Sequence, residues 1–182
     1  MAVPEPALRS ALPPQVAVCG LSCRACAVYL ASRDGSDRLA RLAEKLGHGV
    51  EETRCDGCRA ERRSRHCRAC SLAACAMERG QAVCGTCPDF PCPAYEAFRG
   101  ALPHRREVLT DMADLLMRGP EVWLARMDAR YACGACGEPN SAYDLSCRSC
   151  GHQPGSPFAE THAEVLKAHL PRTAPARGTE HP

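Results

Sequence analysis

Fifteen of the 182 residues are cysteine, and most of them stand in pairs that are separated by two residues. These pairs are Cys23/Cys26, Cys55/Cys58, Cys67/Cys70, Cys84/Cys87, Cys133/Cys136 and Cys147/Cys150. A C-x-x-C turn places two sulfurs on one side of a tight loop, and two such turns complete a tetrahedral four-thiolate site. The spacing therefore predicts metal binding, and metal ligation constrains the fold more than any other feature.

The alternative use of many cysteines is a disulfide framework, which requires an oxidising compartment. The first twenty residues lack a basic start and a continuous apolar stretch, and four prolines interrupt them, so they do not resemble a signal peptide. No later stretch is long and apolar enough to span a membrane. We therefore expect a cytoplasmic protein whose thiols stay reduced and bind metal.

The composition indicates that metal replaces part of the hydrophobic core. Aromatic residues make up 4% of the chain, against 15 prolines and 14 glycines, and residues 48–95 contain few large apolar side chains. A structural zinc site contributes about 10–16 kcal/mol to folding at neutral pH. We predict a small metal-stapled α+β or irregular fold, in which residues 15–100 are largely unfolded without metal.

The sequence divides into five expected parts. They are a flexible N-terminus (1–15), a cysteine-rich metal-binding domain with short helices (16–100), a helical segment (103–129), a zinc ribbon (130–152) and a mostly disordered tail (153–182).

Helices are predicted from apolar periodicity and from end signals. Residues 36–47 carry an apolar face that includes Leu46, with Ser36 or Asp37 as cap and Gly47 as end. Shorter helical turns are expected at 24–32 and 71–79. In the helical segment, one helix is expected from Arg105 to Arg118 and another from Pro120, which carries Val122, Trp123 and Met127. A short amphipathic stretch runs from Phe158 to Leu170.

The C-terminal cysteines read C-x-x-C-G, ten residues, C-x-x-C-G, which resembles a zinc ribbon. The turn at Glu138-Pro139-Asn140 is expected to join two brief strands. Four thiolates leave no open coordination position, so this site is predicted to be structural. Iron in a rubredoxin-like site is the competing interpretation.

The eleven cysteines of 16–100 are not a multiple of four, so their division is open. By chain proximity, one site is Cys55/Cys58/Cys67/Cys70 and a second is Cys75/Cys84/Cys87/Cys92. Cys19, Cys23 and Cys26 then need a fourth ligand, for which His48 and His66 are candidates. The trio also has the C-x3-C-x2-C spacing of radical S-adenosylmethionine enzymes, but the βα repeats of that barrel do not follow. Cys87-Pro88 and Cys92-Pro93 keep an iron–sulfur interpretation of this domain open.

Four motifs in order, CGLSCRACAVYLAS, CDGC, HCRACSLAACAMERG and CGTCPDFPC, resemble a bacterial and archaeal cysteine-rich family, the domain of unknown function 3795. The resemblance covers about residues 19–98. It implies metal binding, with zinc as the expected metal, and it implies no reaction. The matching positions are Cys19, Cys23, Cys26, Tyr29, Cys55, Gly57, Cys58, Cys67, Cys70, Cys75, Cys84, Cys87 and Cys92.

Six arginines crowd the middle cysteines, a pattern that also occurs in nucleic-acid-binding zinc modules: Arg54, Arg59, Arg62, Arg63, Arg65 and Arg68. Ionising all fifteen thiols and adding four Zn²⁺ changes the formal charge from +2 to about −5. Arginines beside thiolates are therefore expected to balance local negative charge. This favours a protein partner, keeps nucleic acid as a lesser alternative, and gives no membrane role.

The sequence contains no Ser/His/Asp grouping, phosphate loop or carboxylate pair that supports a hydrolase or transferase, so the interpretation leans away from an enzyme. The first hypothesis is a zinc protein with structural metals that acts as an interaction module. The second is an iron–sulfur protein with a [4Fe–4S] cluster in 16–100, used for electron transfer or cluster delivery. The third is a zinc enzyme or metal-transfer protein with an open site at Cys19/Cys23/Cys26. The candidate metal ligands are Cys19, Cys23, Cys26, Cys55, Cys58, Cys67, Cys70, Cys75, Cys84, Cys87, Cys92, Cys133, Cys136, Cys147 and Cys150.

Overall fold

The computed structural model describes residues 12–170, and its regular structure is helical. In chain order the elements are η1 (Cys23–Ala25), α2 (Ala27–Asp34), α3 (Ser36–Leu46), α4 (Val50–Thr53), α5 (Arg65–Arg68), α6 (Ser71–Glu78), η2 (Cys84–Thr86), α7 (Pro93–Ala101), η3 (Pro103–Arg105), α8 (Val108–Arg118), α9 (Pro120–Tyr131), α10 (Pro157–Thr161) and α11 (Ala163–His169). No helix among the described residues has both the length and the apolar character that crossing a bilayer requires.

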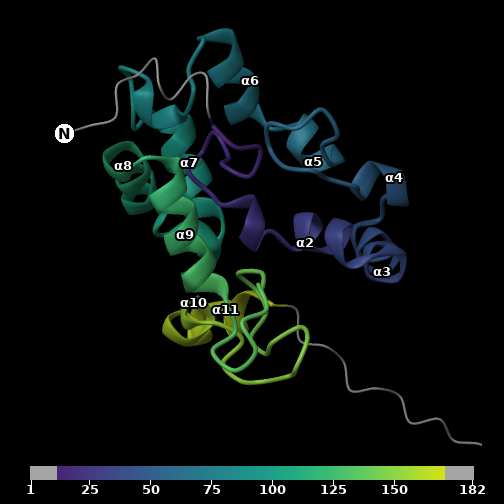
Figure 1. The fold of residues 1–182 in the computed structure, drawn as a ribbon. Coiled ribbons are helices and arrows are strands. Elements are labelled where there is room, and N and C mark those ends of the chain that lie inside the picture. The colour runs from purple at the N-terminus through teal and green to yellow at the C-terminus, as the bar shows by residue number, and fades with distance from the viewer. Residues whose placement is uncertain (1–11, 171–182) are drawn as a thin grey trace, which may run out of the picture.

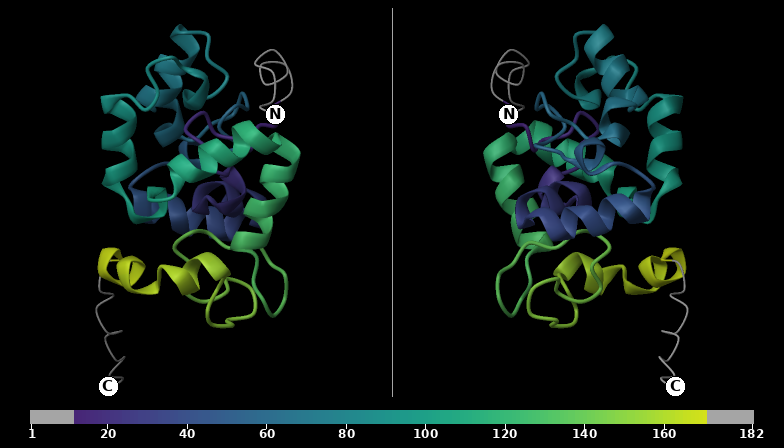
Figure 2. Two further views of the ribbon diagram at one scale, coloured as in Figure 1. Left: turned by 90° about the vertical axis from the view of Figure 1, so that its left-hand side faces the viewer. Right: turned by 90° about the vertical axis from the view of Figure 1, so that its right-hand side faces the viewer.

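The elements are arranged in two tiers (Figure 1). The short helices α2 to α7 form the upper tier, and α8 and α9 run along its side. The loops of 132–156 and helices α10 and α11 form the lower tier, and the two side views of Figure 2 show the same separation.

The prediction for 36–47 is confirmed by α3, which ends where Gly47 takes a left-handed conformation with φ 66°. The N-cap is Gly35, so the expectation of a cap at Ser36 or Asp37 is wrong, because both residues already lie inside the helix. The apolar face of α3 is also narrower in the structure than the sequence predicts. Leu46, at the end of α3, is 45% exposed.

Helices α8 and α9 supply several of the completely buried side chains of the core. Met112, Leu115 and Trp123 are completely buried. The helix expected from Arg105 begins at Val108, since a short η3 turn precedes it. Val122 is 50% exposed, because α9 packs through Trp123 and the residues one and four positions further on.

The core has two parts that meet at α8. One part surrounds Trp123 and joins Val16 and Val83 to Phe158 and Leu166 of the lower tier. The other contains Cys19 and Cys23 with Leu72, Tyr95 and Val108, so thiols take the place of aliphatic side chains in it. Metal ligands and hydrophobic core are therefore interleaved in the upper tier.

The expected β content is not found in the part of the chain that the structure describes. It contains two isolated bridges, Val16 with Ser22 and Ala132 with Pro139, and no strand. Between the two C-terminal cysteine pairs, the residues that were expected to form strands form turns. Pro139 lacks an N–H for strand pairing, and Ser141 to Leu145 is closed by short-range hydrogen bonds.

Part of the expected disordered tail is helical, since α10 and α11 lie within it and bury Phe158 and Leu166. The remaining expectations of flexibility fall on residues 1–11 and 171–182, which lie outside the described residues. Three helices, α4, α5 and α7, appear where no helix was predicted. Of these, α7 begins directly after Cys92 with Pro93 in its first turn.

Candidate metal centres

The four C-terminal cysteines gather into one group, which we call the ribbon cysteines: Cys133, Cys136, Cys147 and Cys150. Their sulfurs all lie within 4.8 Å of one another. The Sγ atoms of Cys133 and Cys150 are 3.7 Å apart, and those of Cys136 and Cys147 are also 3.7 Å apart. Each sulfur therefore lies close to a sulfur of the other C-x-x-C pair.

Both pairs have the same local geometry. The N–H groups of Ala135 and Ser149 point at the sulfur two residues earlier, at 3.4 and 3.5 Å. Gly137 and Gly151 follow with φ of 74° and 75°, a conformation that disfavours any side chain. Backbone N–H groups directed at sulfur stabilise the thiolate form, and at Cys147 the N–H groups of Cys150 and Ser149 lower the thiol pKa to about 6.

The ribbon cysteines fit a single metal ion. Tetrahedral Zn²⁺ with Zn–S bonds of about 2.3 Å requires sulfurs that are about 3.8 Å apart, and the observed pairs are 3.7 Å apart. A multi-iron cluster would hold its thiolates further apart, because an iron atom stands between each thiolate and the cluster centre. The geometry thus matches one four-coordinate ion with no open position.

Asn140 holds the two cysteine pairs of the ribbon in register. Its side chain is completely buried, and its Nδ2 donates to the carbonyl oxygens of Glu138 and Gly155 at 3.0 and 2.8 Å. Its Oδ1 accepts the N–H of Arg148 at 2.9 Å. The sequence indicated a turn at Asn140, but nothing in it pointed to this role.

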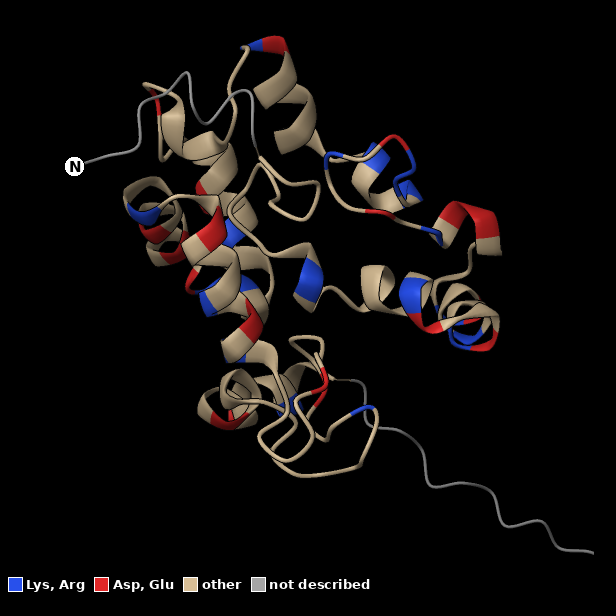
Figure 3. Cartoon of the chain, in the orientation of Figure 1, with Lys and Arg blue, Asp and Glu red and all other residues tan. Residues whose placement is uncertain are grey.

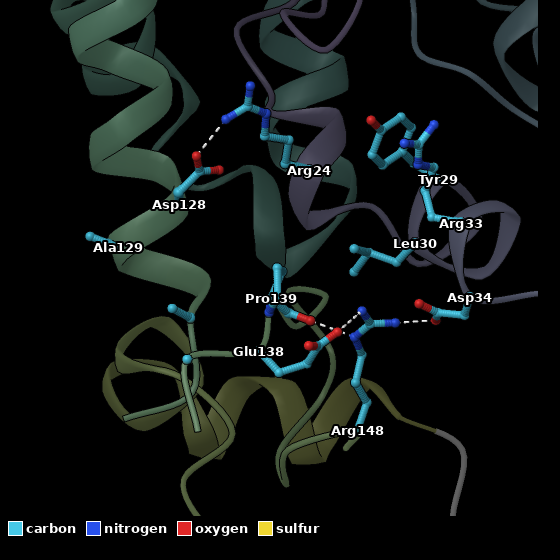
Figure 4. Close-up of a pocket in the computed structure, with 12 residues that line it drawn as sticks. Arg24, Tyr29, Leu30, Arg33, Asp34, Asp128, Ala129, Glu138, Pro139 and Arg148 are labelled. Atoms are coloured by element: carbon cyan, nitrogen blue, oxygen red, sulfur yellow. Dashed lines mark hydrogen bonds and ion pairs between the residues drawn. The ribbon is translucent and has the colours of Figure 1, made fainter. Parts of the chain in front are cut away.

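Arg148 joins the ribbon to the upper tier (Figure 4). It lies between Cys147 and Cys150, and its side chain is only 5% exposed. The guanidinium pairs with Asp34 of α2 and with Glu138, and it also donates to the carbonyl oxygen of Pro139. These residues form one end of a cavity of about 610 Å³ between α2, α9 and the ribbon.

The eleven upper cysteines are arranged differently from the ribbon cysteines. Among residues 12–170, the ribbon is the one place where three or more potential ligand atoms lie within 4.8 Å of one another. Cys19, Cys23 and Cys55 are buried, and most of the others are half-buried. Burial raises the pKa of the Cys19 thiol to about 12 and raises that of Cys23 as well.

Neighbours in space are not always neighbours in sequence. The nearby Cys67 thiol lowers the pKa of Cys55 to about 6, and the Cys55 thiol together with burial raises the pKa of Cys67. Cys58 instead directs its N–H to the Cys23 sulfur at 3.3 Å. The site expected at Cys55/Cys58/Cys67/Cys70 is not drawn together as one compact group.

The trio Cys19/Cys23/Cys26 does not acquire a histidine within ligand distance in the described residues. His66 is exposed on α5, and His48 follows α3, and neither joins a group of potential ligands. The two buried members instead pack among apolar side chains such as Leu72 and Tyr95. The Tyr95 hydroxyl donates to the carbonyl oxygen of Cys19 at 2.9 Å and so holds this segment in place.

The cysteines Cys75, Cys84, Cys87 and Cys92 line a cavity of about 210 Å³ between α6, η2 and the start of α7. Burial raises the pKa of the Cys84 thiol to about 12, and the neighbouring Cys92 thiol adds to this shift. On the exposed side, Arg79 donates from Nη1 to the Cys87 sulfur at 3.0 Å.

The arginines of the middle segment are largely committed within the protein. Arg54 pairs with Glu51, Arg62 with Asp56 and Arg65 with Glu52. Figure 3 accordingly shows basic and acidic segments side by side on α3, α4 and α5.

Arg59 is enclosed by the upper tier. Its Nε donates to the carbonyl oxygen of Val16 at 2.8 Å, and it also donates to that of Ala82. Burial lowers the pKa of this guanidinium, while nearby thiols such as Cys58 and Cys23 oppose the shift. Its position agrees with the expected role in balancing thiolate charge.

Comparison with known protein families yields a match over part of the chain. The model of a family described as a protein of unknown function (DUF3795) matches residues 15–97. This match supports the resemblance drawn from the four cysteine motifs, over nearly the same residues. The helices α8 to α11 and the ribbon cysteines lie outside it. No curated protein and no solved structure matches the chain.

Proposed function

We propose that the chain is a metal-binding protein in which the ribbon cysteines hold one structural Zn²⁺ and the folded scaffold serves as an interaction module. The observation that carries the zinc assignment is the gathering of Cys133, Cys136, Cys147 and Cys150 within 4.8 Å. Four thiolates complete the coordination of Zn²⁺, so the ion stabilises the fold and carries no reaction. It ties the loops of the lower tier to the end of α9.

Metal analysis tests the zinc assignment directly. Protein purified anaerobically from cells supplied with iron and zinc should retain one zinc that depends on the ribbon. Cys136→Ser should release that zinc, whereas Ser149→Ala, at an exposed position of the same ribbon, should keep it. Retention of full zinc by the cysteine variant would contradict the assignment.

A protein partner is supported by apolar side chains that remain exposed on the central helices. Met117 is 56% exposed at the end of α8, and Val122 is 50% exposed at the start of α9. They flank the corner formed by Gly119 and Pro120. Large apolar side chains on a rigid helical corner are suited to contact another protein surface.

Charge substitution at this corner tests the partner proposal. Cross-linking in cells should identify a protein bound to the intact chain, and Met117→Glu with Val122→Glu should abolish that association without changing the metal content. Met77→Glu is the matched control, because Met77 is 77% exposed on α6. Equal association of all these variants would exclude the corner as the contact.

A second candidate function is that of an iron–sulfur protein, and one observation favours it. The upper thiols stand further apart than the ribbon thiols, although many of them are buried or half-buried. An iron–sulfur protein absorbs broadly at about 400 nm and loses this absorbance on reduction, whereas a zinc protein is colourless. The absorption spectrum of anaerobically purified protein therefore separates the two functions for the upper tier.

A further inference from the structure

The cavity lined by Cys75, Cys84, Cys87 and Cys92, here called the cysteine cavity, is built from three elements. Cys75 comes from α6, Cys84 and Cys87 from the start and the C-cap of η2, and Cys92 from the N-cap of α7. All four line the same space of about 210 Å³.

The cysteine cavity is too wide for a lone zinc ion. A single Zn²⁺ needs sulfurs that are about 3.8 Å apart, but no three of these four sulfurs lie within 4.8 Å of one another. The ribbon cysteines meet that condition in the same protein. The cavity volume of about 210 Å³ is several times the ~30 Å³ share of one water molecule. The four thiols therefore surround a space that is large enough for more than one metal ion.

The walls of the cysteine cavity are suited to a polynuclear cluster. Leu72, Ala76 and Phe90 supply apolar surface, and burial of this kind is one of the factors that set the potential of an iron–sulfur centre. Phe90 is held by an edge contact with the Tyr95 ring, with centroids 4.6 Å apart.

A positively charged side chain lies at the outer side of the cysteine cavity. Arg79 Nη1 donates to the Cys87 sulfur at 3.0 Å and is also paired with Asp89 at 2.6 Å. A hydrogen bond to a ligating sulfur stabilises the added negative charge of the reduced cluster and so raises its reduction potential. Arg79 is thus placed to tune a cluster without ligating it.

We propose that Cys75, Cys84, Cys87 and Cys92 hold one [4Fe–4S] cluster, with one thiolate on each iron, while the ribbon cysteines hold a single zinc. This inference rests on the iron–sulfur candidate function stated above, and it assigns that function to one site. It does not depend on the identity of the ribbon metal.

The first test is anaerobic reconstitution of the full-length protein with ferrous iron and sulfide. The wild-type chain should gain about four iron and four sulfide at this site, with a broad band near 400 nm that dithionite bleaches. Cys92→Ser should lose this iron, sulfide and absorbance. The control Cys136→Ser should lose zinc and keep the cluster.

The outcomes separate this inference from the zinc proposal. A Cys92→Ser protein that retains all iron and sulfide overturns the inference. Wild-type protein that takes up zinc alone also overturns it and leaves the zinc proposal intact. Wild-type protein that forms the cluster but holds no zinc at the ribbon overturns the zinc proposal alone.

A second test does not depend on the folding of a cysteine variant. Arg79→Gln removes the hydrogen bond to the Cys87 sulfur, so the cluster's reduction potential should shift to a more negative value. Arg118→Gln is the control, since Arg118 is equally exposed and pairs with Asp114 on α8. Identical potentials in the wild type and both variants would overturn the assignment of the cluster to this cavity.

Discussion

Replacing Asn140 by alanine removes a buried side chain that hydrogen-bonds to both halves of the ribbon. The variant leaves the carbonyl oxygens of Glu138 and Gly155 without their donor and the N–H of Arg148 without its acceptor. None of these groups is freely hydrated, because Asn140 is completely buried in the folded ribbon. The loss therefore falls on the folded state.

The expected magnitude follows from these three hydrogen bonds. Leaving a buried partner unsatisfied costs about 1–3 kcal/mol, and the two part-buried bonds fall toward the lower end, so the sum is about 3 kcal/mol. Binding of a structural metal is coupled to folding of its site. The same energy should therefore weaken zinc binding by the ribbon about 150-fold, at about 1.4 kcal/mol for each factor of ten.

Competition with a chromophoric chelator measures this affinity, and Gln153→Ala provides the control. Gln153 is an exposed amide in the same tier, so its removal should change zinc affinity less than threefold, since exposed substitutions stay within about 0.5 kcal/mol. If Asn140→Ala bound zinc as tightly as Gln153→Ala, the buried amide would not be what holds the ribbon together.

Three further changes test the upper tier and the central helices by urea unfolding of the metal-loaded protein. Tyr95→Phe deletes the buried hydrogen bond of the hydroxyl and should lower the free energy of unfolding by about 1–2 kcal/mol. Tyr29→Phe is the control and should be nearly neutral, because the hydroxyl contact of Tyr29 is longer and part-buried. Equal losses of stability in the two variants would contradict the buried hydrogen bond. Met112→Ala should lower the free energy of unfolding by about 2–5 kcal/mol, because Met112 is completely buried. The control Met77→Ala, at an exposed position, should change it by no more than about 0.5 kcal/mol. A small loss of stability in Met112→Ala would mean that the core is not formed as described. Burial lowers the pKa of His104 to about 4, so the unfolded chain binds the proton first and stability should fall between about pH 6.5 and 4. His104→Gln should remove up to about 3 kcal/mol of that fall, and an unchanged pH profile would refute the burial of a neutral imidazole.

Local signals were sufficient for several elements of the fold. Gly47 ends α3 in the left-handed conformation that glycine adopts without strain, and Pro120 begins α9. The two C-terminal pairs were close in sequence and separated by one short loop, so their approach in space could be predicted from spacing alone. The sequence did not show which stripe of α9 becomes buried, because that depends on where α8 and the lower tier lie, and Val122 falls outside the stripe.

The arrangement of the upper cysteines could not be read from spacing. Cys55 and Cys58 belong to one C-x-x-C motif, yet the nearby Cys67 thiol lowers the pKa of Cys55, while Cys58 directs its N–H to the Cys23 sulfur. Such partners are set by the path of the chain through the core. The ion pair between Arg148 and Asp34 was equally invisible, because it joins residues that are brought together only when the two tiers pack.

The burial of Val16 and Val83 against the central and lower helices has a consequence for how the chain is made. Both valines leave the ribosome well before the residues that cover them, which extend to Leu166. At about 5–20 residues per second, roughly 80 residues of further synthesis take about 4–16 seconds. In the first part of that interval, until α9 is complete at Tyr131, the upper cysteines lack the cover of α8 and α9 and are accessible to metal delivery. The order of translation thus favours metal loading first and closure of the hydrophobic core second.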